Sequence, residues 1–98
     1  MLTKSQITYL RSLAHSKKPV VQIGNKGVTD EVLKEITTSL EHHELMKIKV
    51  AGLNRDNQEE VAGELSSRCH AETVQILGKI ITLFRQREKN SAITLPRD

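Results

Sequence analysis

The chain has 98 residues and a formal net charge of +3, which allows one domain, residues 1–98, and leaves no room for the hydrophobic core of a second domain. Its one cysteine excludes an internal disulfide, and no apolar run approaches the roughly 20 residues of a membrane span. The polar N-terminus does not fit a signal peptide, so we expect a soluble, cytoplasmic protein that is a monomer.

The first predicted element is a helix over residues 4–15. Thr3 is a suitable N-cap, and Gln6 stands three residues later as its capping-box partner. The apolar residues that follow recur at helical spacing: Ile7, Leu10, Leu13 and Ala14. Pro19 cannot continue the helix, and the short β-branched run from Pro19 to Ile23 predicts a strand.

A second helix is predicted with Thr29 as its N-cap and an end near His43. One apolar stripe runs along it: Val32, Leu33, Ile36 and Leu40. The run from Leu45 to Val50 then alternates between apolar side chains and lysines. This alternation predicts a strand that is buried on one face and basic on the other.

A third helix is predicted to follow Asp56, its expected N-cap. Its apolar stripe has the spacing of the second helix: Val61, Ala62, Leu65 and Cys69. Residues 73–77 and 80–85 favour strands, and the glycine-first pair Gly78-Lys79 between them suits a type II′ hairpin turn. From about residue 86 the chain is a polar tail, which either crosses the body of the domain or stays loose.

The predicted order is therefore α-β-α-β-α-β-β, a two-layer α/β fold. Strands that a helix separates are expected to be parallel and the final hairpin antiparallel, so the four strands form a mixed sheet. The matching stripes of the second and third helices place both on the same face of this sheet. Helices then lie mostly on one face, and the opposite face is partly open, as a binding surface would be.

The charged residues are unevenly distributed along the chain. Residues 1–27 carry five bases and no acid, whereas residues 28–44 and 56–72 each carry five acids and one base. The acids are thus concentrated on the second and third predicted helices. A patch of one sign indicates a partner better than the total charge does, so this distribution favours a polyanion-binding face over a solvated mixed surface.

The stretch Gly24-Asn25-Lys26-Gly27 joins the first predicted strand to the second predicted helix. It matches neither the P-loop nor the dinucleotide fingerprint, which leaves a Gly-x-x-Gly loop. Glycines let the backbone approach a sugar-phosphate strand and direct its N–H groups at it, and the lysine adds a positive charge. An ordinary turn, in which the glycines only supply positive φ, is an equal alternative. Because Asp30 and Glu31 already occupy the positive end of the helix, an anion is expected beside the loop and not on the helix axis.

Four further lysines are candidates for a basic track that continues from this loop: Lys17, Lys18, Lys47 and Lys49. The alternative is that they are solvated lysines that keep a sheet face soluble. Arg85 and Arg87 either extend the track or lead into the tail. Phe84 is a candidate for stacking on a base, although one tyrosine and one phenylalanine are too few for a stacking platform.

The histidines and acids do not form a catalytic or metal-binding pattern. His42 and His43 suit the negative end of the second helix for structural reasons alone. Cys69 and His70 lack two further zinc ligands at suitable spacing. No nucleophile–base pair is evident either, so we expect no enzymatic activity, no metal and no cofactor.

Taken together, the chain resembles the CRM domain in its bacterial stand-alone form, the YhbY-like proteins. The resemblance covers about residues 2–97, and its most specific part is IGNKGVTDEV, residues 23–32, followed by LEHHELMKIKV, residues 40–50. Further matching residues are Leu10, Ala14, Pro19, Val20, Val21, Gly78, Leu83 and Arg85. Val28 and Phe84 depart from the leucine and tyrosine that are usual in the family.

The resemblance implies a fold similar to the C-terminal domain of translation initiation factor three, and RNA binding through the Gly-x-x-Gly loop. Bacterial members are associated with precursors of the large ribosomal subunit, and plant relatives with intron splicing. We therefore predict a non-catalytic protein that binds ribosomal RNA during assembly of the large subunit. The predicted RNA-binding residues are Gly24, Asn25, Lys26, Gly27, Lys17, Lys18, Lys47, Lys49 and Arg85. The alternative is a protein-interaction module whose open sheet face binds a protein partner.

Overall fold

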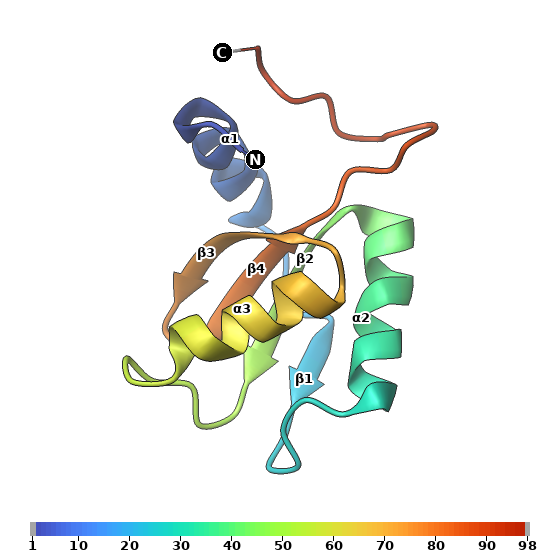
Figure 1. Ribbon diagram of the computed structural model, residues 1–98. Helices are drawn as coiled ribbons and strands as arrows, with labels where there is room; N and C mark the ends of the chain where they lie inside the picture. The colour runs from blue at the N-terminus through green and yellow to red at the C-terminus, as the bar shows by residue number, and fades with distance from the viewer. Residues whose placement is uncertain (1, 98) are drawn as a thin grey trace.

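The computed structural model describes residues 2–97, which form helices and strands in the predicted order (Figure 1). The elements are α1 (Lys4–Ala14), β1 (Val21–Ile23), α2 (Asp30–His43), β2 (Leu45–Val50), α3 (Gln58–Arg68), β3 (Glu72–Leu77) and β4 (Ile80–Phe84). Among these described residues, no helix has both the length and the apolar character that crossing a membrane requires. The predicted α/β fold class is confirmed.

The strands form one mixed sheet in the order β1-β2-β4-β3. β1 and β2 are parallel and are joined through α2, with Ile23 opposite Val50. β4 is antiparallel to both β2 and β3, so the second strand of the final hairpin lies inside the sheet. The predicted parallel crossover and antiparallel hairpin are therefore both present, and Gly78 in the hairpin turn has the positive φ of 60° that a glycine-first turn requires.

The main hydrophobic core lies between the sheet and the helices α2 and α3. Side chains of β2 alternate, and the ones that point into this core are Met46, Ile48 and Val50. They pack with Ile36 and Leu40 of α2 and with Leu65 of α3, all of them buried. The apolar stripes that predicted these two helices are thus the surfaces by which they cover the sheet.

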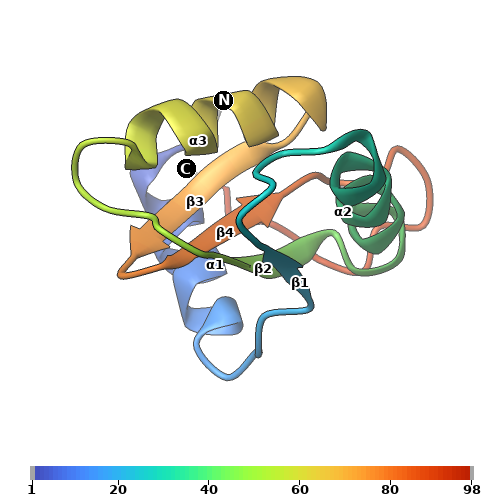
Figure 2. The same ribbon diagram turned by 90° about the horizontal axis from the view of Figure 1, so that it is seen from below.

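A second, smaller core lies on the opposite face of the sheet, where α1 packs (Figure 2). Leu10 and Ala14 of α1 contact Leu45 of β2, Phe84 of β4 and Val74 of β3. Leu45 begins β2 and Phe84 ends β4, so α1 covers one end of this face and leaves the other end uncovered by helices. Two of the helices therefore lie on one face and one on the other.

The helix caps agree with the sequence in two cases and differ in the third. The Thr3 hydroxyl accepts from the Gln6 N–H at 3.2 Å, and the Gln6 side chain accepts from the Thr3 N–H at 3.0 Å. Thr29 caps α2 by accepting from the Val32 N–H at 3.2 Å. Asp56 is not the N-cap of α3: that position is Asn57, and the helix begins at Gln58. The physical reason is an Asx turn: the Asn54 side-chain oxygen accepts from the backbone N–H of Asp56 at 2.8 Å, which keeps this residue in the loop.

The tail crosses the body of the domain and is held there by a buried glutamate. Glu44 follows α2 and is inaccessible to solvent. Its carboxylate accepts four hydrogen bonds from the tail: from the N–H groups of Arg87 at 2.6 Å, Ala92 at 2.7 Å and Ile93 at 3.2 Å, and from the Ser91 hydroxyl at 2.8 Å. Burial acts against its ionised form, but these bonds outweigh burial and lower the pKa of Glu44.

Candidate nucleic-acid interface

The residues Gly24–Gly27, which we call the glycine loop, form a tight turn directly after β1. The Gly27 N–H donates to the Gly24 carbonyl at 3.0 Å and closes this turn. Gly24, Asn25 and Lys26 are exposed, and the loop projects from the end of the molecule that lies away from both chain termini (Figure 1). It also lines a shallow depression with the first turn of α2. A ligand can therefore reach its backbone.

The two glycines of this loop differ in what the fold requires of them. Gly27 has a φ of +73°, in the left-handed region that side chains disfavour, so the turn itself requires a glycine there. Gly24 has no such φ, and a Cβ added to it would meet no atom within 4 Å. The turn therefore explains why position 27 is a glycine, whereas nothing in the fold requires a glycine at position 24.

We expect alanine to distinguish these two positions. Gly27→Ala should lower the free energy of unfolding by about 1 kcal/mol because of its positive φ, whereas Gly24→Ala should leave it unchanged or slightly higher. Urea denaturation of both variants measures this difference. Equal losses of stability in both variants would contradict the assignment of Gly27 alone to the turn.

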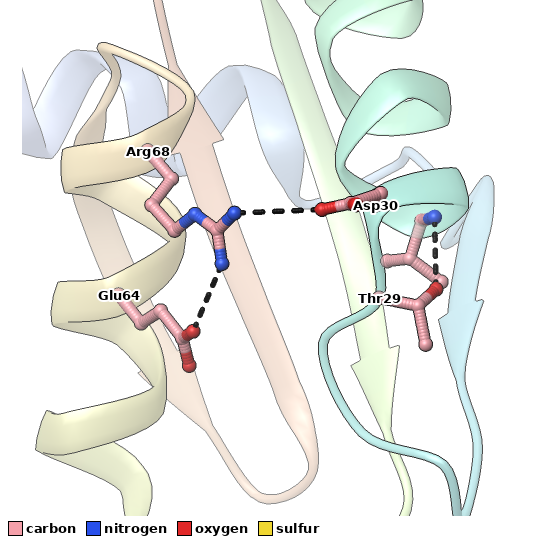
Figure 3. A network of polar contacts seen from close by, with 5 residues as sticks. Thr29, Asp30, Glu64 and Arg68 are labelled. Carbon is pink, nitrogen blue, oxygen red and sulfur yellow. Dashed lines mark hydrogen bonds and ion pairs between the residues drawn. The ribbon is translucent and has the colours of Figure 1, made fainter.

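The acids beside the glycine loop are partly neutralised by a residue that the sequence analysis did not select. Asp30 and Glu31 line the same depression as the loop, as their positions in the first turn of α2 predicted. Arg68, in the last turn of α3, lies 3.5 Å from a carboxylate oxygen of Asp30 and 3.5 Å from one of Glu64 (Figure 3). These exposed ion pairs add little stability, but they place a positive charge beside the acid nearest to the loop.

Two further bases lie at the same end of the sheet as the glycine loop. The Val50 N–H donates to the Lys79 carbonyl at 2.8 Å, which places the β3–β4 turn beside the end of β2. Ile23, which precedes the loop, lies opposite Val50 in the sheet. Arg55, in the segment after β2, and Lys79 are both exposed. The sequence identified the turn at Lys79 but could not place it next to β2, because the strand order was unknown.

The end of the sheet that α1 leaves uncovered carries most of the predicted lysine track. Two rows of side chains cross the strands on the face that carries α1: Gln22, Lys49, Ile80 and Leu77 in one, and Lys47, Thr82 and Gln75 in the other. Neither row contains a carboxylate. Together with Lys17 and Lys18 we call this surface the open basic face.

Depressions in the surface show which of these lysines lie together. Lys18 and Lys49 line one shallow depression with Val20 and Ile80, and Lys17 and Lys18 line a neighbouring one with Val20. Lys47, which is half-buried, is two residues from Lys49 on the same strand and therefore points to the same face. Lys18 precedes β1 and the glycine loop follows it, so β1 connects the open basic face to the loop.

Phe84, which ends β4, and Arg85, which follows it, are not part of the open basic face. The Arg85 guanidinium donates to the Cys69 carbonyl at 3.0 Å and lies 3.7 Å from a carboxylate oxygen of Glu41, on the side of the sheet that α2 and α3 cover. Phe84 is 3% exposed and packs in the α1 core. The hypothesis that Phe84 stacks on a base is therefore wrong, because its ring is not accessible.

His42 has a local structural contact, and Cys69 is buried. His42 Nδ1 lies 2.8 Å from the Thr38 carbonyl, one turn earlier in α2. Cys69 is buried at the end of α3. Within residues 2–97 the structure has no group of three or more histidine, cysteine or acidic side chains placed to hold a metal ion.

The fold and this surface define a small α/β binding domain, with a glycine loop and a basic sheet face. Residues 2–85 match the CRS1 / YhbY (CRM) domain, and the chain belongs to this family. The predicted family is therefore confirmed. The names of the family and of its members indicate RNA-binding proteins, not enzymes.

Two of the relatives are bacterial proteins of similar length. A Haemophilus influenzae protein named "RNA-binding protein" is 41% identical over 96 residues, covering 98% of this chain and 96% of the relative. A Bacillus subtilis protein, named the probable RNA-binding protein YqeI, is 36% identical over 96 residues, covering 98% of this chain and 100% of the relative. The solution structure of a hypothetical Staphylococcus aureus protein, for which RNA binding is suggested, has a TM-score of 0.86 at 42% identity and covers 98% of this chain and 100% of that one.

Proposed function

We propose that this protein is a non-catalytic, cytoplasmic RNA-binding protein that acts as a monomer on ribosomal RNA in precursors of the large ribosomal subunit. The observation that carries the proposal is the open basic face, two rows of side chains without a carboxylate, next to an exposed glycine loop. The names of the relatives support RNA as the ligand. The ribosomal part follows from what membership of the family implies.

The distribution of charge over the two faces supports one direction of approach for the RNA. The exposed sides of α2 and α3 carry six glutamates: Glu31, Glu35, Glu41, Glu59, Glu60 and Glu64. The face with α1 carries Lys4 and Arg11 on that helix, in addition to the lysines of the open basic face. A polyanion is therefore repelled from one side of the sheet and attracted to the other, where the glycine loop is also within reach.

The contact at the tip of the loop gives the first test. Lys26→Ala should weaken RNA binding several-fold and lower the slope of log K against log salt by about 0.7 to 0.9, because one phosphate contact is lost. The melting temperature should not change, since Lys26 is exposed and outside any helix or strand. Fluorescence anisotropy titrations at several salt concentrations measure both affinity and slope.

The matched control is Lys34→Ala, which removes the same charge from the acidic outer side of α2. The control should bind RNA with nearly the wild-type affinity and slope. If both variants lost affinity and slope to the same extent, Lys26 would act only through the net charge of the protein. The glycine loop would then not belong to the RNA interface.

A protein partner remains the second candidate because one exposed apolar side chain, Leu77, belongs to the open basic face and another, Val20, lies beside it. Val20 is 55% exposed and Leu77 is 67% exposed. Crosslinking in cells, followed by identification of what is attached, separates the candidates. Ribosomal RNA from large-subunit precursors supports the proposal, and recovery of a protein without RNA supports the alternative.

A further inference from the structure

We infer that the RNA bound by this surface is double-helical and is held by its sugar-phosphate backbone, without readout of its bases. This inference rests on the proposed function and concerns which form of RNA the same site accepts. It follows from the accessibility of the aromatic rings, from the rigidity of the elements that carry the basic residues, and from the chemistry of the exposed donors.

Proteins that bind unpaired nucleic acid usually stack its bases on aromatic rings, which is worth about 1–3 kcal/mol per base. The whole sequence has one tyrosine, one phenylalanine and no tryptophan. Phe84 is buried, and Tyr9, which is 38% exposed, belongs to α1. This helix packs where β2 begins, whereas the glycine loop lies where β2 ends. Splayed bases at the loop would therefore have none of these rings to stack on.

The basic residues of the interface are attached to elements that are fixed relative to one another. Lys47 and Lys49 project from β2, which has paired strands on both sides. Lys18 and the glycine loop lie at opposite ends of β1, about 20 Å apart along an extended chain. Such a fixed arrangement matches phosphates that are already held in place. A flexible single strand would have to lose conformational entropy to fit it, whereas an A-form helix is ordered before it binds.

The exposed donors suit the groups that a helical RNA presents. Double-stranded RNA is recognised mostly through phosphates and 2′-hydroxyls, because its bases are paired and its deep major groove is closed to side chains. Lysine ammonium groups and backbone N–H groups bind phosphate, and the exposed Asn25 amide can both donate to and accept from a 2′-hydroxyl. Phosphate and ribose contacts of this kind position a ligand but carry no sequence information.

The test compares five labelled ligands of about 16–20 base pairs or nucleotides, a length that reaches across successive grooves. They are an RNA duplex, each of its two separate strands, a second duplex of unrelated sequence, and the DNA duplex of the first sequence. The strands are chosen without self-complementarity. We expect the RNA duplex to bind at least about ten-fold more tightly than either strand, a difference of about 1.4 kcal/mol. The two RNA duplexes should bind within about two-fold of each other, and the DNA duplex more weakly than both, since it lacks the 2′-hydroxyls.

One test variant, two control variants and one optical probe make the result specific to this surface. Lys49→Ala should weaken binding of the RNA duplex several-fold, whereas Lys34→Ala and Tyr9→Ala should not. The fluorescence of 2-aminopurine placed in the part of a single strand that contacts the glycine loop should change little when protein is added, because neither the Tyr9 nor the Phe84 ring lies beside the loop. Single strands that bind as tightly as the duplex, or a strong dependence on base sequence, would overturn the inference while leaving RNA binding intact. Absence of binding to every RNA would instead contradict the proposed function.

Discussion

Replacing Glu44 by glutamine is expected to lower the free energy of unfolding by about 3 kcal/mol and to release the tail. Each carboxylate oxygen of Glu44 accepts two hydrogen bonds, and all four donors belong to residues 87–93. A glutamine side chain has one acceptor oxygen, and its NH₂ group would face two donors in place of the other oxygen. At least one backbone N–H would then lose its acceptor and face an N–H group instead, at a site closed to water.

The same residue predicts a dependence of stability on acid. The pKa of Glu44 is lower in the folded protein than in the unfolded chain, because its hydrogen bonds favour the ionised form more than burial disfavours it. Its contribution is therefore fully present above the unfolded pKa of about 4.3 and is lost as the pH falls through the lower, folded value. Since glutamine does not titrate, the difference in stability between wild type and E44Q should shrink below about pH 4.

Urea denaturation between pH 3 and 7 measures both effects, and hydrogen exchange at the amides of Arg87, Ala92 and Ile93 reports the tail directly. The matched control is Glu35→Gln on the exposed side of α2, which removes the same charge without a buried bond. An E44Q variant as stable as E35Q, with protected tail amides, would show that the carboxylate does not hold the tail.

The elements were predictable where local chemistry decides them. The alternation in Leu45–Val50 gave both the limits of β2 and the assignment of its lysines to one face, because neighbouring side chains of a strand point to opposite sides. Thr3 and Thr29 gave the starts of two helices because a capping hydroxyl acts within three residues. Asp56 failed as a cap because the Asn54 side chain closes a local turn by accepting from the N–H groups of Asp56 and Asn57, and the helix begins only after this turn.

Features that depend on distant pairing were not predictable. Glu44 binds groups 43 to 49 residues away, and its residue type does not distinguish it from the exposed acids of α2 that precede it. Lys79 lies near the glycine loop only because β4 enters the sheet between β2 and β3. The same order places Arg85 against Cys69 and Glu41, away from the lysines of the open basic face. The ion pair between Arg68 and Asp30 was not predictable, because it depends on how α2 and α3 lie relative to each other.

The largest expected effect on binding comes from Gly24→Asp. The fold should tolerate this change, since Gly24 is exposed, has no positive φ and leaves open space around an added Cβ. The added carboxylate would stand where the RNA backbone is proposed to approach the loop. Like charges about 6 Å apart at a protein surface repel by a few kcal/mol before screening by salt. A net loss of about 2 kcal/mol corresponds to about 30-fold weaker binding.

Gly63→Asp provides a control with the same substitution on the other side of the molecule. Gly63 is exposed on α3, beside the glutamates, and an added Cβ there also meets nothing within 4 Å. Gly63→Asp adds an identical charge to a face that RNA is already expected to avoid, so the affinity of this variant for an RNA duplex should stay within about two-fold of wild type.

Both variants should melt within a few degrees of wild type. Because the repulsion at Gly24 is electrostatic, its defect should decrease at high salt as far as binding remains measurable. If Gly24→Asp bound as well as Gly63→Asp, the RNA backbone would not pass close to the loop, and the interface would have to lie on the lysine rows alone.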